Sequence, residues 1–343
     1  MRWRSVGRLG SVCVVATLMA SAGARLDGQS TSRPAAAKAL PRTPDGHPDL
    51  QGVFDYATAT PLQRPAAYAN KSHFTEAEAA DFKRTVAANR ARAEASDSAP
   101  LPAGQVGGYN QFWYEFGTTI VPDRRTSLIT YPENGLLPPL TADAQKRADL
   151  HRANLRRFAE GPEDRDASER CLLGYNSGPP MVGVGYNQHV QIVQTPSYVV
   201  LHNEMVHTAR VVPLDGRPFS PDGMHTWGGT SRGHWDGDTL VVETRNFNDQ
   251  QWNQFSGWNW ASDEKLRVVE RFSLGDANTV RYEATVDDPT VWTSPWTMVA
   301  ALRRTDDMMF EYACHEGNHG MEGILRGARA EERRSIEGAR PAK

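Results

Sequence analysis

The residues best suited to chemistry lie between positions 186 and 247, a stretch that holds five of the ten histidines in the chain. These are His189, His202, His207, His225 and His234. Acidic, basic and aromatic side chains lie among them, including Glu204, Arg210, Trp227 and Arg232. A histidine beside a carboxylate is typical of cofactor-free proton transfer, because the carboxylate orients and tunes the imidazole. This density favours a ligand site within the stretch.

Glu204 and His207 form the pair that we expect to act as acid and base. A strand is predicted over 198–213, and regular alternation would place the two side chains on opposite faces. A β-bulge near Met205 or Val206 would bring them together. In the alternative interpretation, both side chains are solvated on an exposed face of the sheet.

We expect this pair to share a pocket with polar groups from two other parts of the chain. These groups are Arg232 or His234, which we expect to contact the substrate, and His315 or Glu316, which we expect to take part in catalysis. A closing sheet could return a strand predicted at 308–314 to the strand predicted at 189–194. Further side chains are expected to contact the substrate, namely Tyr186, Asn187, His202, Arg210, Trp227 and Trp258. Trp258 belongs to an aromatic, amide-rich loop that could stack on a flat ligand or simply cover the end of a barrel.

Glu270 is a third candidate for a catalytic role because it interrupts an apolar alternation. The other members of that alternation are Leu266, Val268, Phe272 and Leu274. A carboxylate in such company must be paired, or neutral with a raised pKa, and both situations are common in active sites. The alternative is a structural ion pair with an arginine such as Arg281 or Arg303.

Residues 315–319 read His-Glu-Gly-Asn-His and match the H-E-x-x-H pattern of zinc proteases. That chemistry needs both histidines one helical turn apart, with the glutamate beside the metal-bound water. Gly317 weakens a helix at this place, and no third ligand is obvious, although Glu322 could serve. A zinc-dependent hydrolase acting through His315, Glu316 and His319 is therefore an alternative. The main interpretation needs no metal or other cofactor.

The N-terminus has the composition of a secretory signal peptide over residues 1–24. Two arginines precede a short apolar run, and Ala22-Gly23-Ala24 offers a cleavage site. The run is too short for a membrane span. We expect a periplasmic or secreted protein with no membrane anchor after cleavage. The formal net charge of -3, without basic runs outside the termini, argues against nucleic acid as a partner.

Export would leave two cysteines, Cys171 and Cys314. An oxidising compartment favours a disulfide between them. The alternative is a pair of buried free thiols.

Four segments are predicted along the chain: the signal peptide, a disordered lead (25–42), a helical and hairpin part (43–185) and a β-barrel part with a final helix (186–335). In the third segment, Thr75 and Glu78 form a capping box that predicts a helix towards Ala95. Residues 118–131 resemble a β-hairpin around Pro122-Asp123, and another helix is predicted from Thr141.

From residue 186 onward, strands are predicted at regular spacing. Their ranges are roughly 189–194, 198–213, 229–235, 238–247, 265–274, 279–287, 296–304 and 308–314. Turn residues such as Asp236-Gly237 separate them, and short connections require antiparallel neighbours. The pattern predicts a mainly β, antiparallel meander that closes into a barrel or strongly curved sheet (lipocalin-like). A last helix is expected over 318–332.

Several motifs resemble one family of proteins. The motifs are Gln191–Pro196, Glu204-Met205-Val206-His207, Pro213–Pro218, Gly237–Thr244 and Cys314–Asn318, with Pro-Asp-Leu-Gln-Gly-Val over 48–53. They are similar to those of an uncharacterised family of secreted, periplasmic bacterial proteins, over nearly the whole mature chain. The resemblance implies a periplasmic location. It gives no support to zinc, because the family carries Tyr at the position of His319.

These patterns favour a secreted enzyme that uses His/Glu acid–base catalysis on a small organic substrate, as a lyase, isomerase or hydrolase. The alternative from another class is a non-catalytic barrel that binds an apolar or sugar-like ligand. Histidines and carboxylates that face one cavity would favour the enzyme. An entirely apolar cavity would favour the binding protein.

Overall fold

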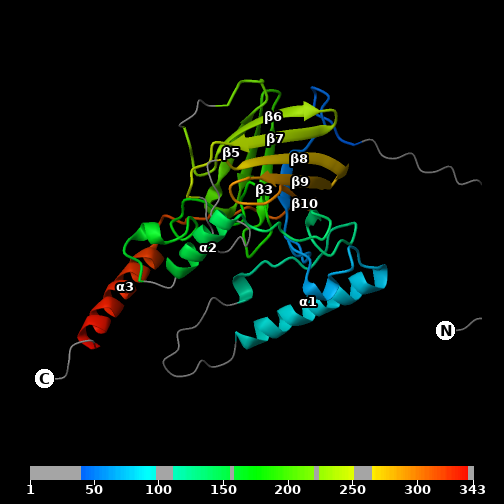
Figure 1. The fold of residues 1–343 in the computed structure, drawn as a ribbon. Coiled ribbons are helices and arrows are strands. Elements are labelled where there is room, and N and C mark those ends of the chain that lie inside the picture. Colours follow the sequence, from blue (N-terminus) through cyan, green and yellow to red (C-terminus); the bar gives the residue numbers. More distant parts are fainter. Residues whose placement is uncertain (1–39, 98–110, 155–157, 220–223, 251–264, 339–343) are drawn as a thin grey trace, which may run out of the picture. The chain divides into compact units, whose positions relative to one another are not determined.

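The structure is a computed structural model that describes residues 40–97, 111–154, 158–219, 224–250 and 265–338 (Figure 1). The expected signal peptide and the loop that contains Trp258 lie outside these residues. Within the described ranges, no helix combines the length and the apolar character that a membrane span needs.

Alternating apolar and polar residues build one antiparallel sheet, as expected. Nine strands follow one another in the order β5-β4-β3-β1-β10-β9-β8-β7-β6, and β2 pairs separately with β10. The strands are β1 (Gly52–Asp55), β2 (Ile129–Tyr131), β3 (His189–Gln194), β4 (Tyr198–Asn203), β5 (Ala209–Pro213), β6 (Thr230–Asp236), β7 (Thr239–Arg245), β8 (Arg267–Asp276), β9 (Thr279–Asp287) and β10 (Trp296–Arg304). The mainly β prediction is confirmed.

The sheet curves until its two ends approach each other. Gly233 on β6 lies so close to β5 that a Cβ atom there would meet Val212 Cγ1 at 2.8 Å. Apolar side chains from every second position fill the interior, among them Val268 and Phe272 of β8, which are fully buried. Because β5 and β6 are the ends of the strand order, this contact makes the sheet a nearly closed barrel.

The expected closure through a strand at 308–314 is wrong. Residues 305–313 form no strand, and Met308 and Phe310 are well exposed. The place beside β10 is taken by β1, which pairs Phe54 with Arg304 on one side and Val53 with Gln191 of β3 on the other. An apolar run alone does not make a strand when the neighbouring edge is already occupied.

The expected hairpin over 118–131 is also wrong. Only β2 forms there, and it pairs with β10 rather than with residues 118–121. Arg125 explains part of this arrangement, because its buried guanidinium donates to the carbonyl oxygen of Val299 in β10 at 3.0 Å. The segment is therefore attached to the barrel and does not fold back on itself.

In the described part of the chain, three α-helices lie outside the barrel sheet (Figure 1). They are α1 (Glu76–Ser96), α2 (Ala142–Asn154) and α3 (His319–Gly338). The capping box of Thr75 and Glu78 is present at the start of α1, as predicted. Asn318 accepts a hydrogen bond from the Met321 N–H at 3.2 Å, which supports its expected place at the start of α3. The described residues also form short 3-10 turns: η1 (Ala66–Tyr68), η2 (Gln111–Trp113), η3 (Pro162–Asp164) and η4 (Met205–His207).

The disulfide between Cys171 and Cys314 is confirmed, with 5.6 Å between the two Cα atoms. It joins the segment before α3 to the segment that precedes β3. Closing a loop of this length stabilises the fold by roughly 4–5 kcal/mol in the chain-entropy model.

Candidate functional site

A tight turn between β3 and β4 places His189 opposite Glu204. The Thr195 N–H donates to the Tyr198 carbonyl at 2.8 Å, and this register pairs Val190 with Asn203. One step further from the turn, the Glu204 N–H donates to the His189 carbonyl at 3.0 Å. The two side chains then meet, with His189 Nδ1 lying 2.8 Å from Glu204 Oε2.

The expected continuous strand over 198–213 is wrong, because η4 interrupts it directly after Glu204. Val206 and His207 have φ values of 55° and 38°, in the left-handed region. This conformation is costly for a β-branched residue such as Val206, and such strain tends to collect at functional sites. The turn leaves the Glu204 side chain buried and the His207 side chain exposed.

Both carboxylate oxygens of Glu204 are occupied. Oε2 accepts from His189, and Oε1 accepts from the Phe310 N–H at 2.9 Å. Burial alone would raise the pKa of this carboxyl, but the hydrogen bonds from His189 and Phe310 outweigh it and the pKa is lowered. Glu204 is therefore an ionised carboxylate, although its residue is only 3% exposed.

The same hydrogen bond with Glu204 raises the pKa of His189. Burial opposes that rise, and the charges of Glu204, Asp55 and Glu115 add to it. Because the ionised carboxylate can only accept, Nδ1 carries the proton in this bond. The second ring nitrogen, Nε2, has no hydrogen-bond partner among the described residues and lies 3.9 Å from Asp307 Oδ2.

His189 lines a polar cavity of about 350 Å³. The other charged groups in its wall are Asp55, Arg90, Glu115, Arg303 and Asp307. The two arginines are engaged within the protein. Arg303 bonds Asp55 at 3.1 Å, and Arg90 donates to the backbone carbonyls of Tyr114 and Phe116. Two of the carboxylates are engaged as well, since Asp55 pairs with Arg303 and Glu115 accepts from the Asn187 N–H. The group of this cavity best placed to exchange a proton with a bound molecule is therefore the second imidazole nitrogen of His189.

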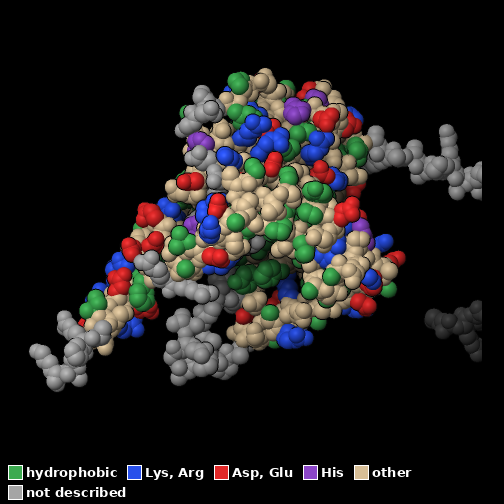
Figure 2. Space-filling view, viewed as in Figure 1, with side chains coloured by type: hydrophobic (Ala, Val, Ile, Leu, Met, Phe, Trp, Pro, Cys, Tyr) green, Lys and Arg blue, Asp and Glu red, His purple; other side chains and the backbone are tan. Residues whose placement is uncertain are grey.

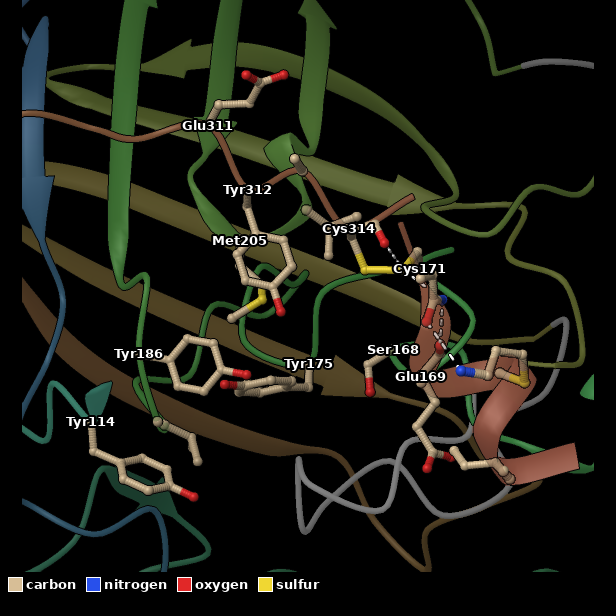
Figure 3. Close-up of a pocket in the computed structure, with 18 of the residues that line it drawn as sticks. Tyr114, Ser168, Glu169, Cys171, Tyr175, Tyr186, Met205, Glu311, Tyr312 and Cys314 are labelled. Atoms are coloured by element: carbon tan, nitrogen blue, oxygen red, sulfur yellow. Dashed lines mark hydrogen bonds between the residues drawn. A yellow bond between two sulfur atoms is a disulfide. The ribbon is translucent and has the colours of Figure 1, made fainter. Parts of the chain in front are cut away.

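A larger, aromatic cavity of about 720 Å³ shares one wall residue, Phe116, with the polar one. Figure 3 shows Tyr175, Tyr186 and Tyr312 converging on one region, with Tyr114 beside Tyr186. The Cys171–Cys314 disulfide lies in the wall of the same cavity. Figure 2 shows hydrophobic side chains gathered in a hollow beneath the strands. The protein therefore has an aromatic cavity and a polar cavity with Phe116 in both walls.

The expected pairing of Glu204 with His207 is wrong. His207 Nδ1 lies 3.1 Å from the Tyr312 carbonyl oxygen, so the histidine touches the backbone instead of the carboxylate. His315 and Glu316 are exposed in the turn before α3. Neither they nor His207 line the polar or the aromatic cavity, and the structure does not bring these three residues together around Glu204.

The residues expected to contact the substrate lie in different parts of the structure. Tyr186 lines the aromatic cavity, and the Asn187 N–H donates to Glu115 Oε2 at 2.7 Å beside the polar one. A third cavity of about 370 Å³ lies between β5 and β6, and its wall includes Arg210, Trp227 and Arg232. His202 on β4 is half-buried and His234 on β6 is exposed, and neither lines the cavity of His189.

Glu270 is buried and paired, as its apolar neighbours require. Its partner is Arg210 of β5, which donates to the two carboxylate oxygens at 2.5 and 2.9 Å. The Tyr282 hydroxyl donates a third bond at 2.7 Å. The suggested partners are wrong, since Arg281 bonds Glu283 and Arg303 bonds Asp55.

The H-E-x-x-H pattern does not form the helix that zinc proteases need. His319 is the first residue of α3, whereas His315 and Glu316 lie before it, and Gly317 has a φ of 69°. The two histidines are therefore not neighbours on one helical turn. Among the described residues, no group of three or more His, Cys, Asp or Glu side chains is placed to hold a metal ion.

His189 is the functional candidate that the sequence analysis missed, although it belongs to the histidine-rich stretch. The position of the turn in the sequence could have identified it. The Thr195-Pro196 turn sets the register of the hairpin, and counting outward from it in both directions places residue 189 opposite residue 204.

Comparison with protein-family models, with curated proteins and with solved structures finds no match for this chain. The function is therefore inferred from the site alone.

Proposed function

We propose that the protein is an exported enzyme that carries out cofactor-free acid–base catalysis on a small organic molecule. His189 is the catalytic acid and base, and Glu204 is its positioning residue. One observation carries the proposal: a buried carboxylate holds one nitrogen of the imidazole, and the other nitrogen faces a cavity.

This arrangement suits proton transfer for three reasons. The hydrogen bond from Nδ1 fixes the tautomer, so that Nε2 presents a lone pair towards the cavity. The carboxylate raises the pKa of the imidazole and strengthens it as a base. Once Nε2 has taken a proton, Glu204 stabilises the resulting charge. Lyase, isomerase and hydrolase reactions can each include such a proton removal, from carbon or from water.

The disulfide supports the proposed location. Disulfides persist in oxidising compartments such as the periplasm and the extracellular space. The Cys171–Cys314 bridge therefore fits a chain that is exported behind the proposed signal peptide.

A non-catalytic binding protein is the second candidate, and the aromatic cavity favours it. Ligand sites are commonly concave and lined by aromatic side chains with few polar groups, as this cavity is. In that case the His189–Glu204 pair would stabilise the turn after β4 and would take no part in a reaction.

The two candidates differ in what happens when His189 is replaced. A panel of small esters, β-hydroxy carbonyl compounds and carbon acids is first screened for thermal stabilisation of the protein and then for turnover. His189→Asn should lower turnover by roughly 10²–10⁴-fold, because an acid–base group contributes about that much. The matched control is His73→Asn, an exposed histidine outside both cavities, which should retain full turnover.

Turnover of the same substrate by wild type and His189→Asn at equal rates would refute the acid–base proposal. If His207→Asn abolished turnover instead, the pairing expected from the sequence would describe the reaction better than the observed hydrogen bond.

A further inference from the structure

The wall of the aromatic cavity has an unusual balance of charge. Its lining residues include four tyrosines and one phenylalanine, together with Glu169 and Glu311. Among the residues that the structure describes, none that lines this cavity is a lysine, an arginine or a histidine. A cavity that bound an anion would be expected to present at least one cationic side chain, so this composition favours a neutral or positively charged ligand.

The tyrosine rings stand close enough together to act on one group. The ring centroids of Tyr114, Tyr175 and Tyr312 lie 6.1, 5.9 and 6.3 Å from the centroid of Tyr186. Tyr175 is nearly perpendicular to Tyr186, at 86°, whereas Tyr312 is nearly parallel to it, at 20°. Rings at different inclinations can present several faces to one ligand. Cations are attracted to such faces within roughly 6 Å of the centroid.

The carboxylates of Glu169 and Glu311 lie at the edges of the cavity, where they contribute a negative electrostatic potential. Figure 3 shows the Glu311 side chain directed away from the tyrosines, and Glu169 on the side of α3. Arg165 bonds Glu169 at 2.7 Å and offsets its charge. In the polar cavity, Arg303 pairs with Asp55 at 3.1 Å and Arg90 pairs with Glu94 at 3.0 Å. Asp307 and Glu115 of the same wall therefore add negative charge.

We propose that the aromatic cavity binds a small organic cation, with an alkylated ammonium group seated against Tyr186. The inference rests on the proposed function in one respect, since it takes this cavity as the binding site for the substrate on which His189 acts. The ammonium group would lie among the rings. The reacting part of the molecule would extend past Phe116, which lines both cavities, towards His189.

Three probes of equal shape test the charge preference: choline, its neutral isostere 3,3-dimethylbutan-1-ol, and the anion 3,3-dimethylbutanoate. Binding to the full-length protein is measured by titration calorimetry. Choline should bind roughly tenfold or more tightly than the neutral isostere, because cation–π attraction from several rings adds to the shared apolar contact. The anion should bind more weakly than both. Equal affinity for choline and its isostere, or no binding of choline, would overturn the proposal.

Two variants at Tyr186 separate the contribution of the aromatic ring to choline binding from that of the hydroxyl. Tyr186→Leu should weaken choline binding by roughly 3–30-fold, whereas Tyr186→Phe keeps the aromatic face and should stay within about twofold of wild type. If Tyr186→Leu fails to fold, Tyr114→Leu tests the same attraction at a ring beside it. A Tyr186→Leu protein that folds and binds choline as wild type does would place the cation elsewhere.

His189→Asn keeps this inference distinct from the proposed reaction. Because His189 lies in the other cavity, the variant should bind choline with wild-type affinity. Choline binding without any turnover that depends on His189 would leave the cation site standing and refute the catalytic proposal. Turnover that depends on His189, without preference for choline over its isostere, would do the reverse.

Discussion

Two buried glutamates in the same barrel meet basic partners in different ways. Glu270 lies in the interior, where Arg210 and Tyr282 donate to its carboxylate and every one of these side chains is buried. Glu204 lies where β4 ends, and it holds one nitrogen of His189 while the other nitrogen faces a cavity. Both carboxylates are satisfied. Only the second pair leaves its basic partner with a group open to a ligand.

The difference shows why burial of a charged residue is a poor guide to function by itself. A buried carboxylate always needs partners, and the requirement is the same in a core and in an active site. The two cases differ in whether the basic partner can still exchange a proton once it is bonded to the carboxylate. An arginine donates to the carboxylate and cannot give up its proton, whereas a histidine can exchange a proton at its second nitrogen.

The largest difference should appear in stability when each glutamate loses its basic partner. Arg210→Met should lower the free energy of unfolding by roughly 3–5 kcal/mol, because Glu270 would remain buried without a counter-charge. The double variant Arg210→Met/Glu270→Leu should recover most of this loss. His189→Asn should cost clearly less, since asparagine can still donate to Glu204. Urea unfolding measures all three, and equal losses for Arg210→Met and His189→Asn would remove the distinction.

A smaller effect is expected on the pH dependence of turnover. In wild type, activity that needs neutral His189 should rise with pH through a midpoint above 6.5, because Glu204 raises the pKa of the imidazole. Glu204→Gln removes the charge and should move that midpoint to lower pH. Rate profiles of the two proteins across this range measure the shift. A purely structural glutamate would leave the midpoint unchanged while lowering stability.

The smallest effect should appear in stability as a function of pH. The pKa of His189 is raised in the folded protein, so its contribution is complete below 6.5 and is lost as the pH rises through the folded value. The pKa of Glu204 is lowered, so its contribution is present above 4.5 and is lost as the pH falls through the folded value. The stability difference between wild type and His189→Asn should therefore be largest between pH 4.5 and 6.5. A difference that persisted unchanged into alkaline solution would contradict the ion pair.

Features that depend on neighbouring residues could be predicted from the sequence. The capping box at Thr75, the turn at Asp236-Gly237 and the alternation around Glu270 are local patterns, and each gave the correct element. The Cys171–Cys314 disulfide followed from the count of cysteines and the expected compartment.

Features that depend on distant parts of the chain could not be predicted in this way. No local signal places β1 between β3 and β10, and this insertion excludes the strand expected at 308–314. The apolar residues Met205 and Val206 also give no sign of the left-handed turn at Val206. That turn separates His207 from Glu204. Arg210 could not be chosen over Arg281 as the partner of Glu270, because the pair crosses from β5 to β8 inside the barrel.

β1 also determines the order in which the barrel can be completed. It joins β3–β5 to β6–β10, two groups whose strands are mostly neighbours in sequence. Its own pairs, Val53 with Gln191 and Phe54 with Arg304, connect residues far apart along the chain. Closing such long loops costs conformational entropy and slows folding. β1 is synthesised before the other strands, yet its second edge has no partner until β10 exists. The hydrogen-bonded sheet therefore becomes continuous only after β10, which ends at Arg304, has been made.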